Sequence, residues 1–93
     1  MLSLPVGFLI LLALTEGPAY SSELTRRIIA ITLGRYVSGT SLYDEISRLV
    51  WAGWVERRGK RELVITSEGM RRLKLEIRQL KLAQEVAQKR GLW

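Results

Sequence analysis

The chain has 93 residues, a formal net charge of +6, and neither cysteine nor histidine. This composition excludes disulfides, thiolate nucleophiles, metal sites built from Cys and His, and the histidine general base of many enzymes. The length allows one domain with a modest core, to which oligomerisation would add stability, and the charge favours an acidic partner such as nucleic acid.

A first helix is predicted from about Ser3 to Thr15 by the apolar run FLILLAL at residues 8–14. The run lacks the preceding basic residues and the following cleavage site of a signal peptide. It is also too short for a membrane span, which needs ~20 apolar residues. We therefore expect a cytoplasmic protein with no membrane partner. Its first helix should be buried on nearly all sides, by the core and by a second subunit.

A second helix is predicted after the turn at residues 17–20. Ser21 or Ser22, followed by Glu23, supplies a cap and an acidic first turn, and Gly34 ends the helix. The expected buried stripe is Leu24, Ile28 and Ile31, with Arg26 and Arg27 on the opposite side. The next turn carries Arg35, which lies either near a phosphate backbone or in solvent as a loop charge.

The third predicted helix has two contrasting faces. Leu42, Ile46, Leu49, Val50 and Gly53 recur at helical spacing and form the core face. The opposite side gathers Thr40, Asp44, Ser47 and Arg48, flanked by Ser41 and Tyr43. Either Thr40 or Ser41 caps the helix, the latter with Asp44 three residues on, and Gly53 ends it. The polar face is therefore small and rich in hydrogen-bonding groups.

A β-hairpin is predicted directly after this helix, because the β-rich runs WVERR and ELVIT flank the turn at residues 59–61. Arg57, Arg58, Lys60 and Arg61 place four cations at its tip. Such a cluster suits phosphate contact or insertion into a groove, although a charged hairpin alone is also typical of a solvated turn. Beside the polar-faced helix it indicates a winged helix-turn-helix, in which the helix enters the DNA major groove.

The last predicted element is a long helix from Thr66 or Ser67 to about Lys89. Its apolar residues follow two stripes: Met70, Leu73, Ile77 and Leu80, continued by Gln84 and Ala87, and a second one of Leu75, Leu82 and Val86. About 22 residues at 1.5 Å each span ~33 Å, longer than so small a domain can bury. We therefore predict a homodimer, with an interface formed by Leu4, Phe8, Leu11, Leu12, Met70, Leu73, Ile77, Leu80, Gln84, Ala87 and Trp93.

Together these elements predict a mainly α fold with a small β-hairpin. Residues 1–66 form a winged helix-turn-helix and residues 67–93 a C-terminal dimerisation helix within the same compact unit. Contacts to double-stranded DNA are expected from Ser21, Ser22, Arg35, Ser38, Thr40, Ser41, Tyr43, Asp44, Ser47, Arg48, Arg57, Arg58, Lys60 and Arg61. Arg48 can donate twice to a guanine edge or grip a phosphate. Asp44 can accept from a cytosine amino group or pair with Arg48.

Over about residues 8–75 the sequence resembles the PadR-like winged helix-turn-helix transcriptional regulators. The resemblance lies in ILLALTEGPAYSSEL, in SGTSLYDEISRL and in ITSEGMRRL. Tyr43 stands at the tyrosine position of that family's recognition helix, and Ile46 and Leu49 stand at its leucine positions. The family implies a homodimer, joined through its first and last helices, that binds a palindromic operator, often as a repressor. Some members release the operator on binding an aromatic effector.

Other classes of function fit the sequence less well. The hydroxyls and carboxylates between Ser38 and Glu45 are explained by helix capping and lack a base that could activate a nucleophile. No Gly-rich phosphate loop or metal-ligand spacing occurs, so we expect no catalytic residues, no cofactor and no metal. The main alternative is a winged-helix module that binds another protein. A peripheral membrane protein is disfavoured, because a dimer would bury the same apolar stripes.

The tryptophans could also form a pocket for a small aromatic effector. Trp54 is explained by packing at the start of the first strand. Trp51 lies on the polar side of the third helix and must pack on the hairpin, a partner or DNA. These packing roles are favoured over the ligand pocket.

Overall fold

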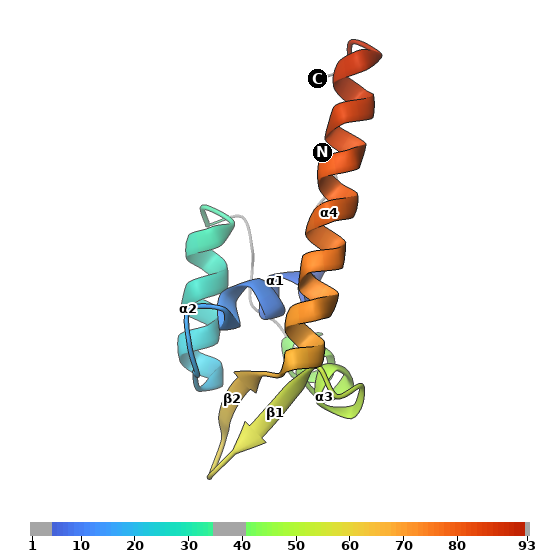
Figure 1. Cartoon of the computed structure of the whole chain (residues 1–93). Helices are drawn as coiled ribbons and strands as arrows, with labels where there is room; N and C mark the ends of the chain where they lie inside the picture. Colours follow the sequence, from blue (N-terminus) through green and yellow to red (C-terminus); the bar gives the residue numbers. More distant parts are fainter. Residues whose placement is uncertain (1–4, 35–40, 93) are drawn as a thin grey trace.

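A computed structural model describes residues 5–34 and 41–92, except for the side chain of Ser41. The helices are α1 (Val6–Leu14), α2 (Ser21–Ile31), α3 (Ser41–Trp51) and α4 (Ser67–Lys89), and the strands are β1 (Val55–Arg58) and β2 (Glu62–Ile65) (Figure 1). The two strands pair antiparallel. The predicted fold class is therefore confirmed: a mainly helical, winged helix-turn-helix arrangement with a long C-terminal helix.

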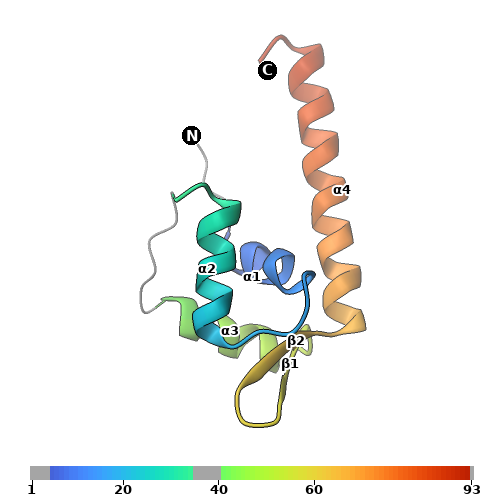
Figure 2. The same cartoon turned by 90° about the vertical axis from the view of Figure 1, so that its left-hand side faces the viewer.

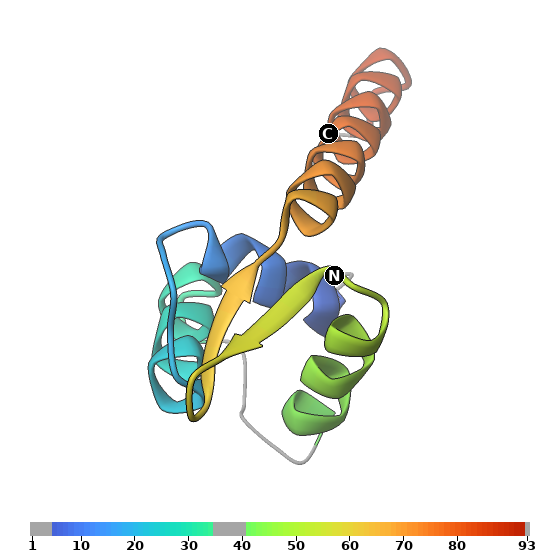
Figure 3. The same ribbon diagram turned by 60° about the horizontal axis from the view of Figure 1, so that its bottom comes forward.

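Helix α1 lies at the centre of the fold and packs against α2, α3, α4 and β2. Figures 1 and 2 show α2 and α4 on either side of α1, with the hairpin at the end of the molecule opposite the free end of α4. In Figure 3 this end comes forward, and α2, the hairpin and α3 are arranged across it while α4 points away. The molecule measures 49 × 27 × 21 Å along its principal axes, which reflects the length of α4.

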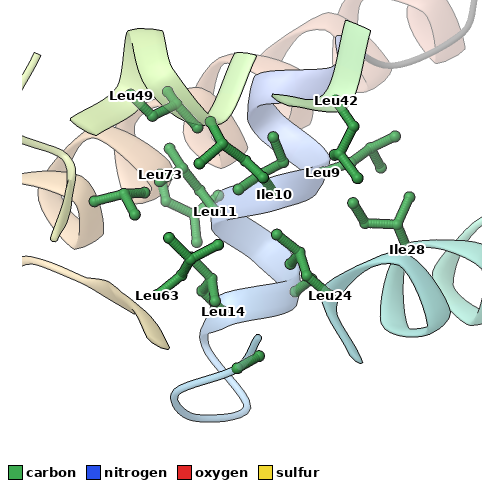
Figure 4. Close-up of a cluster of buried hydrophobic side chains, with 14 residues drawn as sticks. Leu9, Ile10, Leu11, Leu14, Leu24, Ile28, Leu42, Leu49, Leu63 and Leu73 are labelled. Carbon is green, nitrogen blue, oxygen red and sulfur yellow. The ribbon is translucent and has the colours of Figure 1, made fainter. Parts of the chain in front are cut away.

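The core surrounds α1, as the apolar sequence of this helix predicts. Five of its nine residues are buried, and they meet side chains from every neighbouring element (Figure 4). The contributing residues are Leu9, Ile10, Leu11, Ala13 and Leu14 of α1, Ala19 of the following turn, Leu24 and Ile28 of α2, Leu42, Ile46 and Leu49 of α3, and Val55, Leu63 and Leu73 beyond them. Phe8 and Leu12 are only partly buried, so α1 leaves one apolar edge at the surface.

The start and the buried stripe of α2 differ from the prediction. The N-cap is Tyr20, whose side chain makes no capping hydrogen bond, so neither Ser21 nor Ser22 caps the helix. Ile31, predicted to be buried, is 37% exposed because it lies at the last turn, past the buried Leu24 and Ile28. The predicted end is confirmed, since the Gly34 amide donates back to the Ile29 carbonyl at 2.9 Å.

Arg27 also departs from the prediction that it faces solvent. Its side chain is only 16% exposed. The guanidinium donates to the carbonyl oxygens of Ala13 (3.3 Å), Gly17 (2.7 Å) and Pro18 (3.4 Å). Glu16 and Glu23 lie on the same guanidinium as ion-pair partners. Arg27 therefore ties α2 to the end of α1 and to the turn after it, where α1 leaves carbonyls without helical partners.

The hairpin forms where the two β-rich runs around Gly59 predict it. Val55 pairs with Ile65 and Arg58 with Glu62, and the loop between the strands turns at Gly59, whose φ is +55°. Ala19 adds a short bridge to β2, with two hydrogen bonds to Leu63 at 2.8 and 3.0 Å. The bridge therefore ties β2, near its loop end, to the turn between α1 and α2, while the loop residues that follow Arg58 lie exposed beyond it.

Helix α4 begins and ends as predicted. Its N-cap is Thr66, whose hydroxyl oxygen accepts from the Gly69 amide at 3.0 Å. The same hydroxyl donates to the Gly53 carbonyl at 2.7 Å, which links the start of α4 to the end of α3. Within residues 5–34 and 41–92, no helix is both long and apolar enough to cross a membrane.

Candidate nucleic-acid interface

The outer face of α3 is polar and open to solvent. Leu42, Ile46 and Leu49 hold the helix against the core, so the residues between them point outward. Tyr43 is 65% exposed, and Asp44, Ser47 and Arg48 are exposed as well. The two-faced character predicted for this helix is thus confirmed, and its outer side offers hydroxyl, carboxylate and guanidinium groups to a ligand.

Arg48 forms its ion pair with Glu45 and not with Asp44, the partner that the sequence suggested. Glu45 lies three residues before Arg48, and its carboxylate is 3.5 Å from the guanidinium. Glu45 is half-buried, with its side chain 26% exposed, whereas 77% of the Arg48 side chain is exposed. Glu45 can therefore orient the guanidinium while the donating edge stays accessible. Asp44 is left exposed and without an ion pair to any residue that the structure describes.

The hairpin carries two of its cations at the end of β1 and two in the loop that follows. Arg57, Arg58, Lys60 and Arg61 are all exposed, while Val55 and Leu63 anchor the strands in the core. None of the four cations forms an ion pair within residues 5–34 and 41–92. Their charge is therefore available to an anion such as a nucleic-acid phosphate.

The start of α2 lies at the same end of the molecule as the hairpin and α3 (Figure 3). Ser22 is exposed and Ser21 half-buried. Because Tyr20 provides no side-chain cap, the amides of the first turn are open to an external acceptor, and the helix dipole favours an anion there. The remaining predicted contacts Arg35, Ser38 and Thr40, and the side chain of Ser41, lie outside the described residues.

Two tryptophans flank the C-terminal end of α3 in different environments. Trp54 packs against the core, as predicted, and the Arg72 guanidinium lies over its ring at 5.3 Å from the centroid. No signal in the sequence indicates this cation–π contact, since only the fold brings the two residues together. Trp51 is 92% exposed and therefore does not pack on the hairpin. Of the three surfaces predicted for it, a partner and DNA remain.

Only some of the residues predicted to form a subunit interface are exposed on the surface of the chain. On α4, Leu75, Ile77, Leu80, Leu82 and Val86 are each between 42% and 56% exposed, and Gln84 is exposed too. Phe8, Leu12, Met70 and Ala87 are partly buried. Leu11 and Leu73 require correction: each is 2% exposed inside the chain's own core and offers almost no surface to a second subunit. Leu4 and Trp93 lie outside the described residues.

No group of three or more acidic residues suited to a metal ion occurs in the part of the chain that the structure describes. The features of the site are instead a polar helix, a cationic hairpin and an uncapped helix start at one end of a helical domain. This fold and this exposed face define a winged helix-turn-helix protein.

The chain is similar to a solved structure of a transcriptional regulator from Clostridium thermocellum. The two share 32% sequence identity, with a TM-score of 0.78, and the match covers 90% of each chain. The chain therefore belongs to the family of that transcriptional regulator. No protein-family model matches the sequence, and no curated protein matches it. The relationship indicates a role in transcription regulation rather than in catalysis.

Proposed function

We propose that this protein is a transcriptional repressor of the PadR-like type that binds a palindromic DNA operator as a homodimer. The observation that carries the proposal is the arrangement of α3, the hairpin and the start of α2 across one end of the molecule (Figure 3). Each of these elements offers groups of the kind that bind DNA. The relative from Clostridium thermocellum, a transcriptional regulator, supports the same class of function.

In the proposed complex α3 enters the major groove and the hairpin reaches the flanking backbone or minor groove. Arg48 supplies the main base contact, because its exposed fork can donate to both acceptors of a guanine. The four hairpin cations neutralise phosphates, which gives affinity without sequence information. The open amides at the start of α2 donate hydrogen bonds to the oxygens of a further phosphate.

The homodimer is proposed because α4 exposes too much apolar surface for a helix in water. Its distal half extends beyond the rest of the fold (Figures 1 and 2), where Leu80, Leu82 and Val86 have no core to cover them. A second copy of the chain would bury these residues together with the partly exposed edge of α1. Two subunits related by a two-fold axis would then match the two halves of a palindrome.

The test is the dependence of binding on salt, measured by titrating a labelled random-sequence duplex at several salt concentrations. We expect the logarithm of the binding constant to fall linearly with the logarithm of salt concentration, with a slope of about −7 if the four hairpin cations of each subunit in the homodimer all neutralise a phosphate. A binding constant too weak to measure at low salt would contradict DNA binding. It would favour the winged-helix protein-interaction module instead, for which the exposed Trp51 offers an apolar contact.

A further inference from the structure

Helix α4 begins directly against the peptide that links α3 to β1. The Thr66 hydroxyl donates to the Gly53 carbonyl at 2.7 Å, and the Thr66 amide donates to the Trp54 carbonyl at 3.1 Å. One turn later, Gly69 lies so close that a Cβ on it would overlap the Trp54 carbonyl oxygen. We call Gly53, Trp54, Thr66, Gly69 and Arg72 the joint, since they connect the third helix and the hairpin to α4.

Arg72 extends the joint by one further turn of α4. Its guanidinium lies over the Trp54 ring at 5.3 Å from the centroid and pairs with Glu76 at 2.9 Å. The guanidinium is thus held by an ion pair with Glu76 of α4 and by a cation–π contact with Trp54, the residue before β1. At 44% exposure the Arg72 side chain is not held in place by burial, so the two contacts determine its position.

Beyond the joint, α3 and α4 are separated by a hollow of about 310 Å³. The residues around it come from the start of α1, from α3 and from α4, among them Phe8, Arg48, Trp54 and Arg72. Packed side chains therefore do not fill the space between the two helices here. Leu49 of α3 and Leu73 of α4 belong to the core that surrounds α1. At the hollow, the contact between the end of α3 and α4 is the one between Trp54 and Arg72.

The length of α4 makes the angle at the joint important. Its 23 residues span about 34 Å at 1.5 Å per residue. A rotation of about 6° at the joint moves the far end of such a helix by roughly 3.5 Å, which is close to the ~3.4 Å rise of one base pair. Because the displacements of the two subunits add across a two-fold axis, a loss of stiffness of this size at the joint would let the separation of the two recognition helices vary by up to about two base pairs.

We propose that Arg72 and Trp54 are positioning residues that fix the angle between α3 and α4, and thereby set the spacing of the two operator half-sites. This inference rests on the proposed function, because it assumes a dimer on DNA that is joined through α4. Neither residue needs to touch DNA. Their contact transmits the geometry of the dimer helix to the recognition helix, so that an operator with the wrong spacing engages only one subunit.

The experiment measures binding to a single half-site and to palindromes whose half-sites are moved apart or together by one to three base pairs. The variants are Arg72→Gln and Trp54→Leu. The matched control is Arg71→Gln, because Arg71 is the neighbouring residue of α4, pairs with Glu68, and loses the same charge without involving Trp54. Trp54→Phe serves as the conservative variant, since it keeps an aromatic ring for the guanidinium.

The wild type, Arg71→Gln and Trp54→Phe should bind one spacing roughly tenfold or more tighter than the others, because avidity requires both subunits to engage. In Arg72→Gln and Trp54→Leu this preference should fall to about threefold or less, with affinity for a single half-site within about twofold of the wild type. An unchanged spacing preference in either variant would overturn the inference. Failure of the wild type to bind any of the palindromes would instead overturn the proposed function.

Discussion

The guanidinium of Arg27 donates a hydrogen bond to the carbonyl oxygen of Gly17 at 2.7 Å. This contact joins the second helix to the turn that follows the first, across ten residues of sequence. The same guanidinium also serves Ala13 and Pro18, so a single side chain satisfies three carbonyls around the end of α1. Because α3 packs against α1 in the core, a contact that stabilises the end of α1 also stabilises the position of α3.

Replacing Arg27 with alanine should lower the free energy of unfolding by about 2 kcal/mol, since it removes charge-assisted hydrogen bonds from partly buried carbonyls. Arg26→Ala is the matched control. Arg26 is the adjacent arginine, 75% exposed and paired only with Glu23 among the described residues, so its loss should cost about 0.5 kcal/mol or less. Urea denaturation of the two variants measures the difference. Equal effects would show that Arg27 is only a surface charge.

The role of Arg27 could not be predicted from the sequence, because its partners are backbone carbonyls of a turn whose path depends on the whole fold. The same reason explains Leu11 and Leu73, which share an apolar pattern with Ile77. Periodicity shows that a face is apolar, but it does not distinguish a residue covered by its own chain from one covered by another. By contrast, the boundaries of α4 and the two faces of α3 follow from local signals, such as the Thr66 cap and the apolar spacing up to Gly53.

On the outer face of α3, the exposure of Tyr43, Asp44 and Arg48 agrees with the sequence pattern, but the pattern did not indicate how the charged residues pair. Asp44 and Glu45 both lie within one turn of Arg48, and helical spacing allows either to bind it. The partial burial of Glu45 beside the core selects the pair that forms. Similarly, Arg72 and Trp54 are 18 positions apart, and only the strand-to-helix junction brings them into contact.

A charge in the apolar strip of α4 should dissociate the dimer. Ile77 is 44% exposed, so Ile77→Glu leaves the monomer core intact while placing a carboxylate in the proposed interface. Sedimentation at micromolar concentration should give a dimer for the wild type and a monomer for this variant. Lys74→Glu, an exposed position on the basic side of α4, is the control and should remain dimeric. A monomeric wild type would contradict the proposed dimer.

Removing cations from the hairpin tip should weaken binding to all DNA sequences alike. Alanine at Arg57 and Lys60, both exposed and free of ion pairs within the described chain, should flatten the salt slope by about four units, because two phosphate contacts are lost in each subunit of the homodimer. Alanine at Lys74 and Lys81 of α4 removes the same charge away from the proposed interface. Identical slopes for the two double variants would show that the hairpin does not contact phosphate.

Arg48→Ala should relax the preference for one base in each half-site, at a cost of about 1–3 kcal/mol for the preferred operator. The reason is that a guanidinium contacting a guanine edge discriminates between bases, whereas one gripping a phosphate does not. Binding to operators that carry each of the four bases at every position distinguishes the two roles. A uniform loss of affinity across all these sequences would assign Arg48 to the backbone.

Selection of bound duplexes from a random pool by the wild-type protein tests the proposal that α3 and the hairpin recognise a symmetric DNA sequence. We predict enrichment of a palindrome whose half-site centres are about 10 base pairs, or a multiple of one helical turn, apart. A pool that shows no enriched sequence after repeated selection, or one enriched in a motif without two-fold symmetry, would contradict the claim.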